Sequence, residues 1–203
     1  MAHERRGPVP TATGEKGAPV DGELREMIGG DRRETVDGEF RDMMAAFPTG
    51  VSVVTAQRGG DAPWGMTCSS LCSLSMAPPT LLICLRAQSP TLDAVLAGGA
   101  FAVNLLHGDA ESVAALFASG AADRFERVAW KPSARTGSPA LVEAAHAVAD
   151  CTVVRSHPAG DHVIVVGAVR AVEHYDRGSA LLYGFRQYGE WARPLPVSRG
   201  AHG

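Results

Sequence analysis

Residues 64–75 read WGMTCSSLCSLS, and seven of these twelve side chains end in a hydroxyl or a thiol. A polar run of this kind is typical of a loop or linker. Here it lies between GVSVVTAQ (50–57) and TLLICLRA (80–87), two apolar segments with the composition of strands. With RGGDAP (58–63) as a hairpin turn, we predict that 64–75 pairs back on 50–57 as a second strand and that 80–87 is a third.

Helical patterns flank these strands. In DGEFRDMMAAFPTG (37–50), Asp37 is a plausible N-cap, and Pro48 with Gly50 ends the helix. SPTLDAVLAGG (89–99) has a serine N-cap, a proline at the first helical position and glycines at its end, and 109–119 is a further helix. In the first helix, one face is apolar: Phe40, Met43, Met44 and Phe47.

The remaining pattern is dominated by strands. AFAVNLL (100–106) is one, residues 119–139 are loop-like, and 146–157 and 162–174 are two long strands joined by PAGD (158–161). Strands outnumber helices and most neighbours are linked by hairpins, which favours a mainly β, antiparallel Greek-key barrel with a few short flanking helices. Neither GxGxxG nor GxxxxGK[ST] occurs, so any nucleotide must be held in another way.

Length and composition set limits on function. A chain of 203 residues with 45% hydrophobic residues is most simply one domain, and its net charge of −3 gives no basic footprint for nucleic acid. No apolar run is long enough to cross a membrane and the N-terminus lacks a signal-peptide core, so we predict a cytoplasmic protein. The cysteines form no CxxC pair and no metal site, and we expect buried, reduced thiols at Cys68, Cys72, Cys84 and Cys151.

We divide the chain into three parts. Residues 1–36 carry thirteen charged side chains and no Phe, Trp or Tyr, a composition that predicts a disordered N-terminal tail. Residues 37–193 form the folded domain, and residues 194–203 are a flexible C-terminus.

Three stretches are candidates for a ligand site. In GMTCSS (65–70), small residues such as Gly65 would let a flat ligand approach the backbone, with hydroxyls and main-chain N–H groups for its polar edge. The alternative is a Ser/Thr-rich strand with one solvent face. In LRAQSPT (85–91), Arg86 at a strand end and Ser89 with Thr91 at a helix start make an anion site; the alternative is plain N-capping.

Together these two stretches suggest a ligand with a flat ring beside a phosphate, which is the description of a flavin nucleotide. The third stretch, AGDHVIVVGAV (159–169), has His162 just after a tight turn. This histidine could touch a second ligand above the flavin, or it is a surface turn residue.

The chain resembles the flavin reductase component of two-component flavin-dependent monooxygenases, of the flavin-reductase-like, FMN-binding split-barrel family. The segments that carry the resemblance run in order from about residue 38 to 191: FPTGVSVVTA, GMTCSSLCSLSMAPPTLLICL, SPT, GAFAVNLL, ADRF, GSPAL, AGDHVIVVGAV and LLYGFRQYGEW. The resemblance implies an NAD(P)H:flavin oxidoreductase acting on FMN or FAD with NADH or NADPH. It also implies a homodimer with flavin near the subunit interface, and a separate monooxygenase reached by diffusing reduced flavin.

The same resemblance implies roles for individual residues. Nicotinamide contacts are assigned to Gly160, Asp161 and His162, with His162 as the catalytic residue. Cys68 and Cys72 depart from the usual pattern, which has alanine and often an aromatic there. Flavin contacts are assigned to Gly65, Met66, Thr67, Ser69, Ser70, Leu85, Arg86, Ser89, Thr91, Phe117 and Arg124.

Two other functions remain open on the residues. A pyridoxamine-phosphate-oxidase-like enzyme would want several basic phosphate ligands, and the chain has two lysines, Lys16 and Lys131. A non-enzymatic flavin- or haem-binding sensor would use the charged tail as its interaction module. Hydride transfer needs no general base, so the lack of a catalytic triad or carboxylate pair agrees with a reductase.

Overall fold

The computed structural model describes residues 30–192, and the side chains from residue 36 onward. The helices are α2 (Gly30–Ala46), α3 (Pro90–Gly98) and α4 (Glu111–Ser119), with a short 3-10 helix η1 (Gly108–Ala110). The strands are β1 (Thr49–Gly50), β2 (Ser52–Ala56), β3 (Trp64–Cys68), β4 (Cys72–Met76), β5 (Pro79–Arg86), β6 (Ala100–Leu106), β7 (Lys131–Pro132), β8 (Pro139–Ala140), β9 (Ala145–Ala159), β10 (His162–His174), β11 (Ser179–Gly184) and β12 (Gln187–Ala192).

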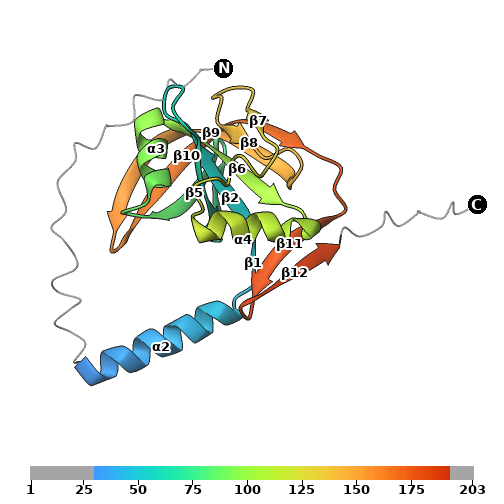
Figure 1. Cartoon of the computed structure of the whole chain (residues 1–203). Helices are drawn as coiled ribbons and strands as arrows, with labels where there is room; N and C mark the ends of the chain where they lie inside the picture. The colour runs from blue at the N-terminus through green and yellow to red at the C-terminus, as the bar shows by residue number, and fades with distance from the viewer. Residues whose placement is uncertain (1–29, 193–203) are drawn as a thin grey trace, which may run out of the picture.

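An antiparallel sheet of seven strands forms the body, in the order β3-β2-β6-β9-β10-β5-β4. A second sheet has the order β1-β11-β12, and β7 pairs with β8 (Figure 1). The prediction of a mainly β, antiparallel fold with few helices is confirmed. The predicted helix at 89–99 is α3, with Ser89 as its N-cap and Gly99 in the left-handed conformation as its C-cap.

The prediction of a single strand at 64–75 is wrong, because this stretch contributes to two strands. β3 and β4 are separated by three residues, yet they lie at opposite edges of the seven-stranded sheet. The four steps from Cys68 to Cys72 reach at most about 14 Å. The edges of a flat seven-stranded sheet lie about 29 Å apart. The sheet must therefore curl into a split barrel, whose edges approach each other without pairing.

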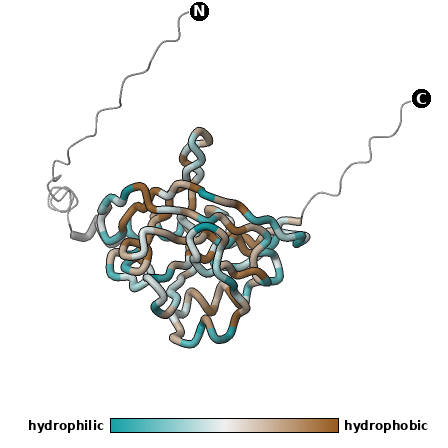
Figure 2. The backbone as a smooth tube through the Cα atoms, turned by 90° about the horizontal axis from the view of Figure 1, so that it is seen from above, coloured by the Kyte–Doolittle hydropathy of each residue, from teal (hydrophilic) through white to brown (hydrophobic). Residues whose placement is uncertain are grey.

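Two large apolar clusters fill the curled sheet, and a small third one includes Ala102 and Val148. One lies between the sheet and α3 and includes Ile83, Leu85, Val95 and Phe101. The other lies under α4 and includes Leu106, Phe117 and Leu141. Figure 2 shows hydrophobic segments running through the body and hydrophilic ones at its turns.

Gly167 lets β10 pass closely over β6. A Cβ at this position would lie 2.4 Å from the Cζ atom of Phe101, so only glycine fits beneath the ring. The β9–β10 register shifts between Val166 and Gly167, which bends this long hairpin.

The hairpin β11–β12 was not predicted as strands. Its turn is formed by Phe185 and Arg186, with φ of 52° and 60°. Turns of this kind normally contain Asn or Gly, so the sequence lacks the usual signal.

The first helix differs from its prediction in two respects. It begins at Gly30, so Asp37 lies inside the helix and is not its N-cap, and residues 30–36 are helical. The apolar face is not in the core: Phe40 is 57% exposed and Met43 60%. Of the tail predicted at 1–36, residues 1–29 lie outside the described residues, as do the C-terminal residues 193–203.

Helices of membrane-spanning length and hydropathy do not occur between residues 30 and 192.

Candidate functional site

The end of β5 and the start of β10 lie side by side, and this places two predicted site residues together. Arg86 and His162 are cross-strand partners. The turn between β9 and β10 is tied to this end, because the Asp161 carbonyl accepts a hydrogen bond of 3.0 Å from Ala87 N–H. Gly160 takes the left-handed conformation, φ 60°, that this turn requires.

Asp161 orients the imidazole of His162. Its Oδ1 atom lies 2.8 Å from Nδ1 of the ring. The hydrogen bond and the charge of His162 lower the pKa of Asp161. Asp161 is exposed and His162 half-buried, so the ring is held at the surface with its Nε2 atom directed away from this carboxylate.

The N-terminus of α3 lies next to the same end of the sheet. Ser89 Oγ accepts a hydrogen bond of 3.2 Å from Thr91 N–H and lies 3.4 Å from Sδ of Met66 on β3. Met66, Ser89 and the main chain of Arg86 therefore lie together at this end of the sheet. Thr91 is 2% exposed and Leu85 is fully buried, so neither residue offers surface to a ligand in this structure.

β3 supplies an open edge beside this helix terminus. Within the described strands it pairs with β2 alone, so alternate main-chain N–H and C=O groups on its other edge are free of the ladder. The exposed Ser69 follows directly. Ser70 has a structural role, because its hydroxyl donates to the Cys84 carbonyl at 2.9 Å and accepts from Cys84 N–H at 3.2 Å.

Two predicted flavin contacts face the other side of β3. The Thr67 hydroxyl donates a 2.6 Å hydrogen bond to the Ala114 carbonyl of α4. Gly65 is buried, and a Cβ there would lie 2.9 Å from Cε1 of Phe117. The packing of Phe117 thus explains Gly65 within this chain, and the predicted approach of a flat ligand is not needed to account for it. Phe117 itself is buried against Phe125, with ring centroids 5.2 Å apart.

Arg124 is a buried cation that lies against Trp64, the first residue of β3. It is 6% exposed, its Nη1 donates to the Ala121 carbonyl at 3.0 Å, and its guanidinium lies 5.5 Å from the centre of the Trp64 ring. Burial lowers the pKa of Arg124. Its Nε atom is the buried side-chain nitrogen or oxygen that finds no hydrogen-bond partner in the described part of the chain.

These features match the chemical groups of a flavin nucleotide, which has a planar polar ring and a phosphate. The open edge of β3 offers hydrogen-bonding groups to a planar polar ring, and the N-terminus of α3 with Arg86 offers an anion site. The orphaned Nε of Arg124 is a further donor that an anionic or carbonyl-rich ligand could satisfy. Groups of three or more His, Cys, Asp or Glu side chains that could hold a metal do not occur among residues 36–192.

The thiols are less uniform than expected. Cys68 and Cys151 are buried, whereas Cys84 is half-buried and Cys72 is exposed. All four are free. Burial raises the pKa of Cys68, and raises that of Cys151 to about 12, so these two thiols are protonated at neutral pH.

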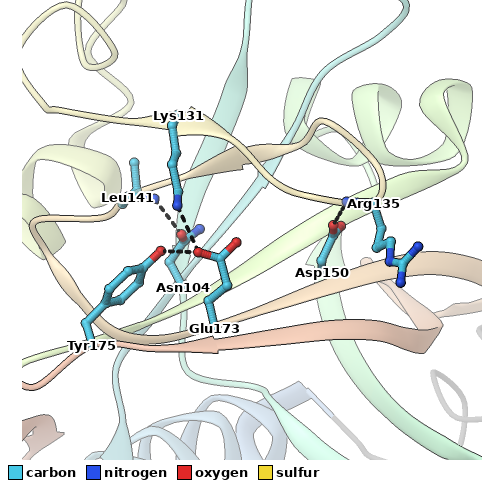
Figure 3. Close-up of polar contacts among 7 residues, drawn as sticks. All are labelled: Asn104, Lys131, Arg135, Leu141, Asp150, Glu173 and Tyr175. Atoms are coloured by element: carbon cyan, nitrogen blue, oxygen red, sulfur yellow. Dashed lines mark hydrogen bonds and ion pairs between the residues drawn. The ribbon is translucent and has the colours of Figure 1, made fainter.

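A polar network on the far side of the sheet was missed from the sequence (Figure 3). Asn104, in the apolar strand β6, donates to Val53 O at 3.0 Å and accepts from Leu141 N–H at 2.7 Å. Asp150 accepts hydrogen bonds from Arg135 N–H at 2.8 Å and from Thr136 N–H at 3.1 Å. A lone asparagine inside AFAVNLL was the available signal. These side chains fasten residues 131–141 to the sheet.

Comparison with known proteins identifies the fold. The family model described as "Flavin reductase like domain" matches residues 44–192. The chain belongs to the flavin reductase-like family. "Flavin reductase (NADPH)" of Lentzea aerocolonigenes is 48% identical over 149 residues, covering 73% of this chain and 86% of that protein. "Flavin reductase (NADH)" of Kitasatospora aureofaciens is 45% identical over 150 residues, covering 73% and 78%.

A solved member of this family has the same architecture. BorF, the flavin reductase component of a bacterial two-component tryptophan halogenase, superposes with a TM-score of 0.70 at 34% identity. The match covers 78% of this chain and 99% of BorF. The resemblance stated from the sequence motifs is thereby confirmed at the level of the family.

Proposed function

We propose that this chain is an NAD(P)H:flavin oxidoreductase that reduces FMN or FAD. The observation that carries the proposal is the convergence of Arg86, the N-terminus of α3 and the open edge of β3 at one end of the barrel, in a member of the flavin reductase-like family. The similarity to reductases named for NADPH and for NADH supports the reaction class and leaves the choice of nicotinamide open.

Each group at this end has a part in binding. Arg86 and the first N–H groups of α3 would hold the phosphate of the flavin. The main-chain groups from Met66 to Ser70, in β3 and the two residues after it, would bind the polar ring edge and stabilise negative charge on it. With Arg124, these are the residues we retain as flavin contacts, whereas Thr67 could act only through its main chain and Leu85, Thr91 and Phe117 are buried and could act only as support.

His162 is proposed to orient the nicotinamide. The hydrogen bond to Asp161 orients the ring, and Nε2, on the side away from this carboxylate, is available for a hydrogen bond with the carboxamide of the nicotinamide. When bound, the flavin supplies a hydride acceptor, N5, for the hydride on C4 of the nicotinamide. The chain holds the two rings within reach of each other, and no side chain has to remove a proton for the transfer.

We further propose a homodimer whose reduced flavin diffuses to a separate monooxygenase, in the cytoplasm. The similarity to BorF, a reductase component of a two-component system, supports a separate oxygenase. Arg86 lies exposed at the strand end, and a single exposed cation favours a ligand that can leave. A self-contained sensor or oxidase would gain from a tighter hold on the cofactor.

Steady-state oxidation of NADH and of NADPH, with FMN and with FAD, tests the reaction. Arg86→Ala should raise the KM for flavin about tenfold, because it removes one charge-assisted contact. Arg155→Ala is the matched control, an exposed arginine on β9, which is separated from β5 by β10, and should leave that KM unchanged. No turnover with any pair of substrates would instead favour the flavin- or haem-binding sensor.

A further inference from the structure

Trp64, the first residue of β3, is a large aromatic side chain that this chain leaves partly open to solvent. It is 38% exposed, whereas the two phenylalanines that pack against the next residue of the strand, Phe117 and Phe125, are buried and half-buried. The guanidinium of Arg124 lies 5.5 Å from the centre of the indole ring. Because a cation over the face of an indole is attracted to it, Arg124 fixes the orientation of this ring at the surface.

Arg124 also brings a positive charge to this position. In the described part of the chain none of the ion pairs includes it, and the neighbouring Asp123 instead approaches the exposed Arg127, at 3.8 Å. Arg124 is 6% exposed, and its Nε atom is the buried nitrogen without a hydrogen-bond partner. Buried charges are normally paired. Together, Trp64 and Arg124 therefore suit a ligand that carries both a planar ring and a negative charge.

The place of Trp64 on β3 relates it to the flavin site. Residues two positions apart on a strand share a face, so Trp64 and Met66 lie on the same face of β3, with about 7 Å between their Cα atoms. Met66 Sδ lies 3.4 Å from Ser89 Oγ at the N-terminus of α3, where we place the phosphate. The polar ring edge belongs to the main chain from Met66 towards Ser70. The order of the sites along the strand is therefore planar ring, phosphate and Trp64.

We propose that Trp64 is a stacking platform for the adenine ring of a dinucleotide, and that this chain consequently binds FAD more tightly than FMN. The inference rests on the proposed function and specifies its flavin. In FAD the order of the groups is isoalloxazine, phosphates and adenine, which is the order of the sites along β3. The second phosphate supplies negative charge for Arg124, and the adenine supplies a flat ring for the indole. FMN ends at its single phosphate and has neither group.

NAD(P)H carries an adenine of the same chemistry and is the second source of such a ring. The order of the sites along β3 favours the flavin, because the phosphate site between the planar ring and Trp64 is the one assigned to it. The two sources are distinguished by comparing each dinucleotide with the mononucleotide that lacks its adenine. These pairs are FAD with FMN, and NADH with reduced nicotinamide mononucleotide.

Isothermal titration calorimetry of the full-length chain measures the dissociation constants of FAD and FMN without turnover. The wild type should bind FAD at least about tenfold more tightly than FMN, because stacking of a base on an aromatic side chain has about this effect on affinity. Trp64→Ala should weaken FAD about tenfold and FMN less than about twofold. Trp64→Phe keeps an aromatic face and should keep most of the preference.

Trp191→Ala is the matched control. Trp191 is also an exposed tryptophan, but it lies in β12 of the other sheet, so its removal should change neither dissociation constant. A variant that is merely less stable would bind both flavins more weakly, so the ratio of the two constants separates stacking from folding. Circular dichroism confirms that each variant is folded.

Three results would overturn the proposal for FAD. The first is a wild type that binds FMN as tightly as FAD. The second is a Trp64→Ala variant in which both flavins are weakened equally or not at all. The third is a selective rise in the KM for NADH over its mononucleotide with FAD unchanged, which would assign the adenine on Trp64 to the nicotinamide dinucleotide. Failure of the proposed function is distinct from all three, because it would appear as a wild type that oxidises neither NADH nor NADPH with either flavin.

Discussion

Polar side chains in the middle of the sheet and polar side chains at its β5–β10 end differ in what they bind. Asn104 and Asp150 are buried, and their amide and carboxylate groups are taken up by the main chain of neighbouring segments. Arg86 and His162 lie at the surface, at a strand end next to a helix terminus. The comparison shows that a polar residue inside a strand can be structural, whereas those left at the end of the barrel are the candidates for ligand contact.

The largest effect should come from breaking the buried network. Asn104→Ala removes the hydrogen bonds to Val53, Thr55 and Leu141 and leaves the buried Leu141 N–H without this partner, so we expect a loss of about 3 kcal/mol in the free energy of unfolding. Chemical denaturation measures it. Gln57→Ala also loses an amide hydrogen bond, to Asp61, but at the surface, and should cost no more than about 0.5 kcal/mol. Equal losses would show that the network does not stabilise the sheet.

The packing of β3 against α4 can be tested in the same way. Gly65→Ala would push a methyl group into the Phe117 ring on the α4 side, and we expect a loss of about 2 kcal/mol in stability. Gly189→Ala, in strand β12 with open space around it, is the matched control. If Gly65→Ala left stability unchanged but abolished flavin binding, the close approach predicted from the sequence would be correct after all.

At the ligand end, function should change while stability does not. His162→Ala should raise the KM for NAD(P)H more than that for flavin, with a loss of about 1–2 kcal/mol in the transition-state stabilisation given by kcat/KM. His157→Ala, an exposed histidine on the same hairpin, should have no effect. Unchanged nicotinamide kinetics in His162→Ala would remove His162 from the site.

The smallest expected effect is a difference in thiol reactivity. Cys72 is exposed and should react first with a disulfide reagent such as DTNB, followed by Cys84. The raised pKa values of Cys68 and Cys151 and their burial should keep both unreactive until the chain unfolds. Fast labelling of Cys68 in the folded chain would contradict the packing described for this edge of the barrel.

Local signals predicted part of the fold well. α3 was predicted with both its caps because Ser89 and Pro90 mark its start, and Gly99 its end, through the local conformation of the backbone. The division of 64–75 into β3 and β4 could not be predicted, because it depends on which strands lie at the edges of a curled sheet. The apolar face of α2 looks like a core face in sequence, and only the structure shows that Phe40 and Met43 are exposed.

The site was predicted unevenly for the same reason. Arg86, Ser89 and His162 follow strand ends or turns, and the pairing of β5 with β10 brings them together. Thr67 and Gly65 have the residue types of a ligand-binding strand, but their partners, Ala114 and Phe117, belong to a helix about fifty positions away. Sequence spacing carries no information on such contacts.

The central claim is that the β5–β10 end of the barrel binds a flavin that is reduced by NAD(P)H and then released. The most direct measurement places the protein, NAD(P)H and FMN or FAD on one side of a dialysis membrane that retains protein, and cytochrome c on the other. We predict that cytochrome c is reduced, because reduced flavin crosses the membrane after each of many turnovers. A flavin that copurifies in equal amount with the chain, survives dialysis and leaves cytochrome c oxidised would contradict the claim and point to a self-contained flavoprotein.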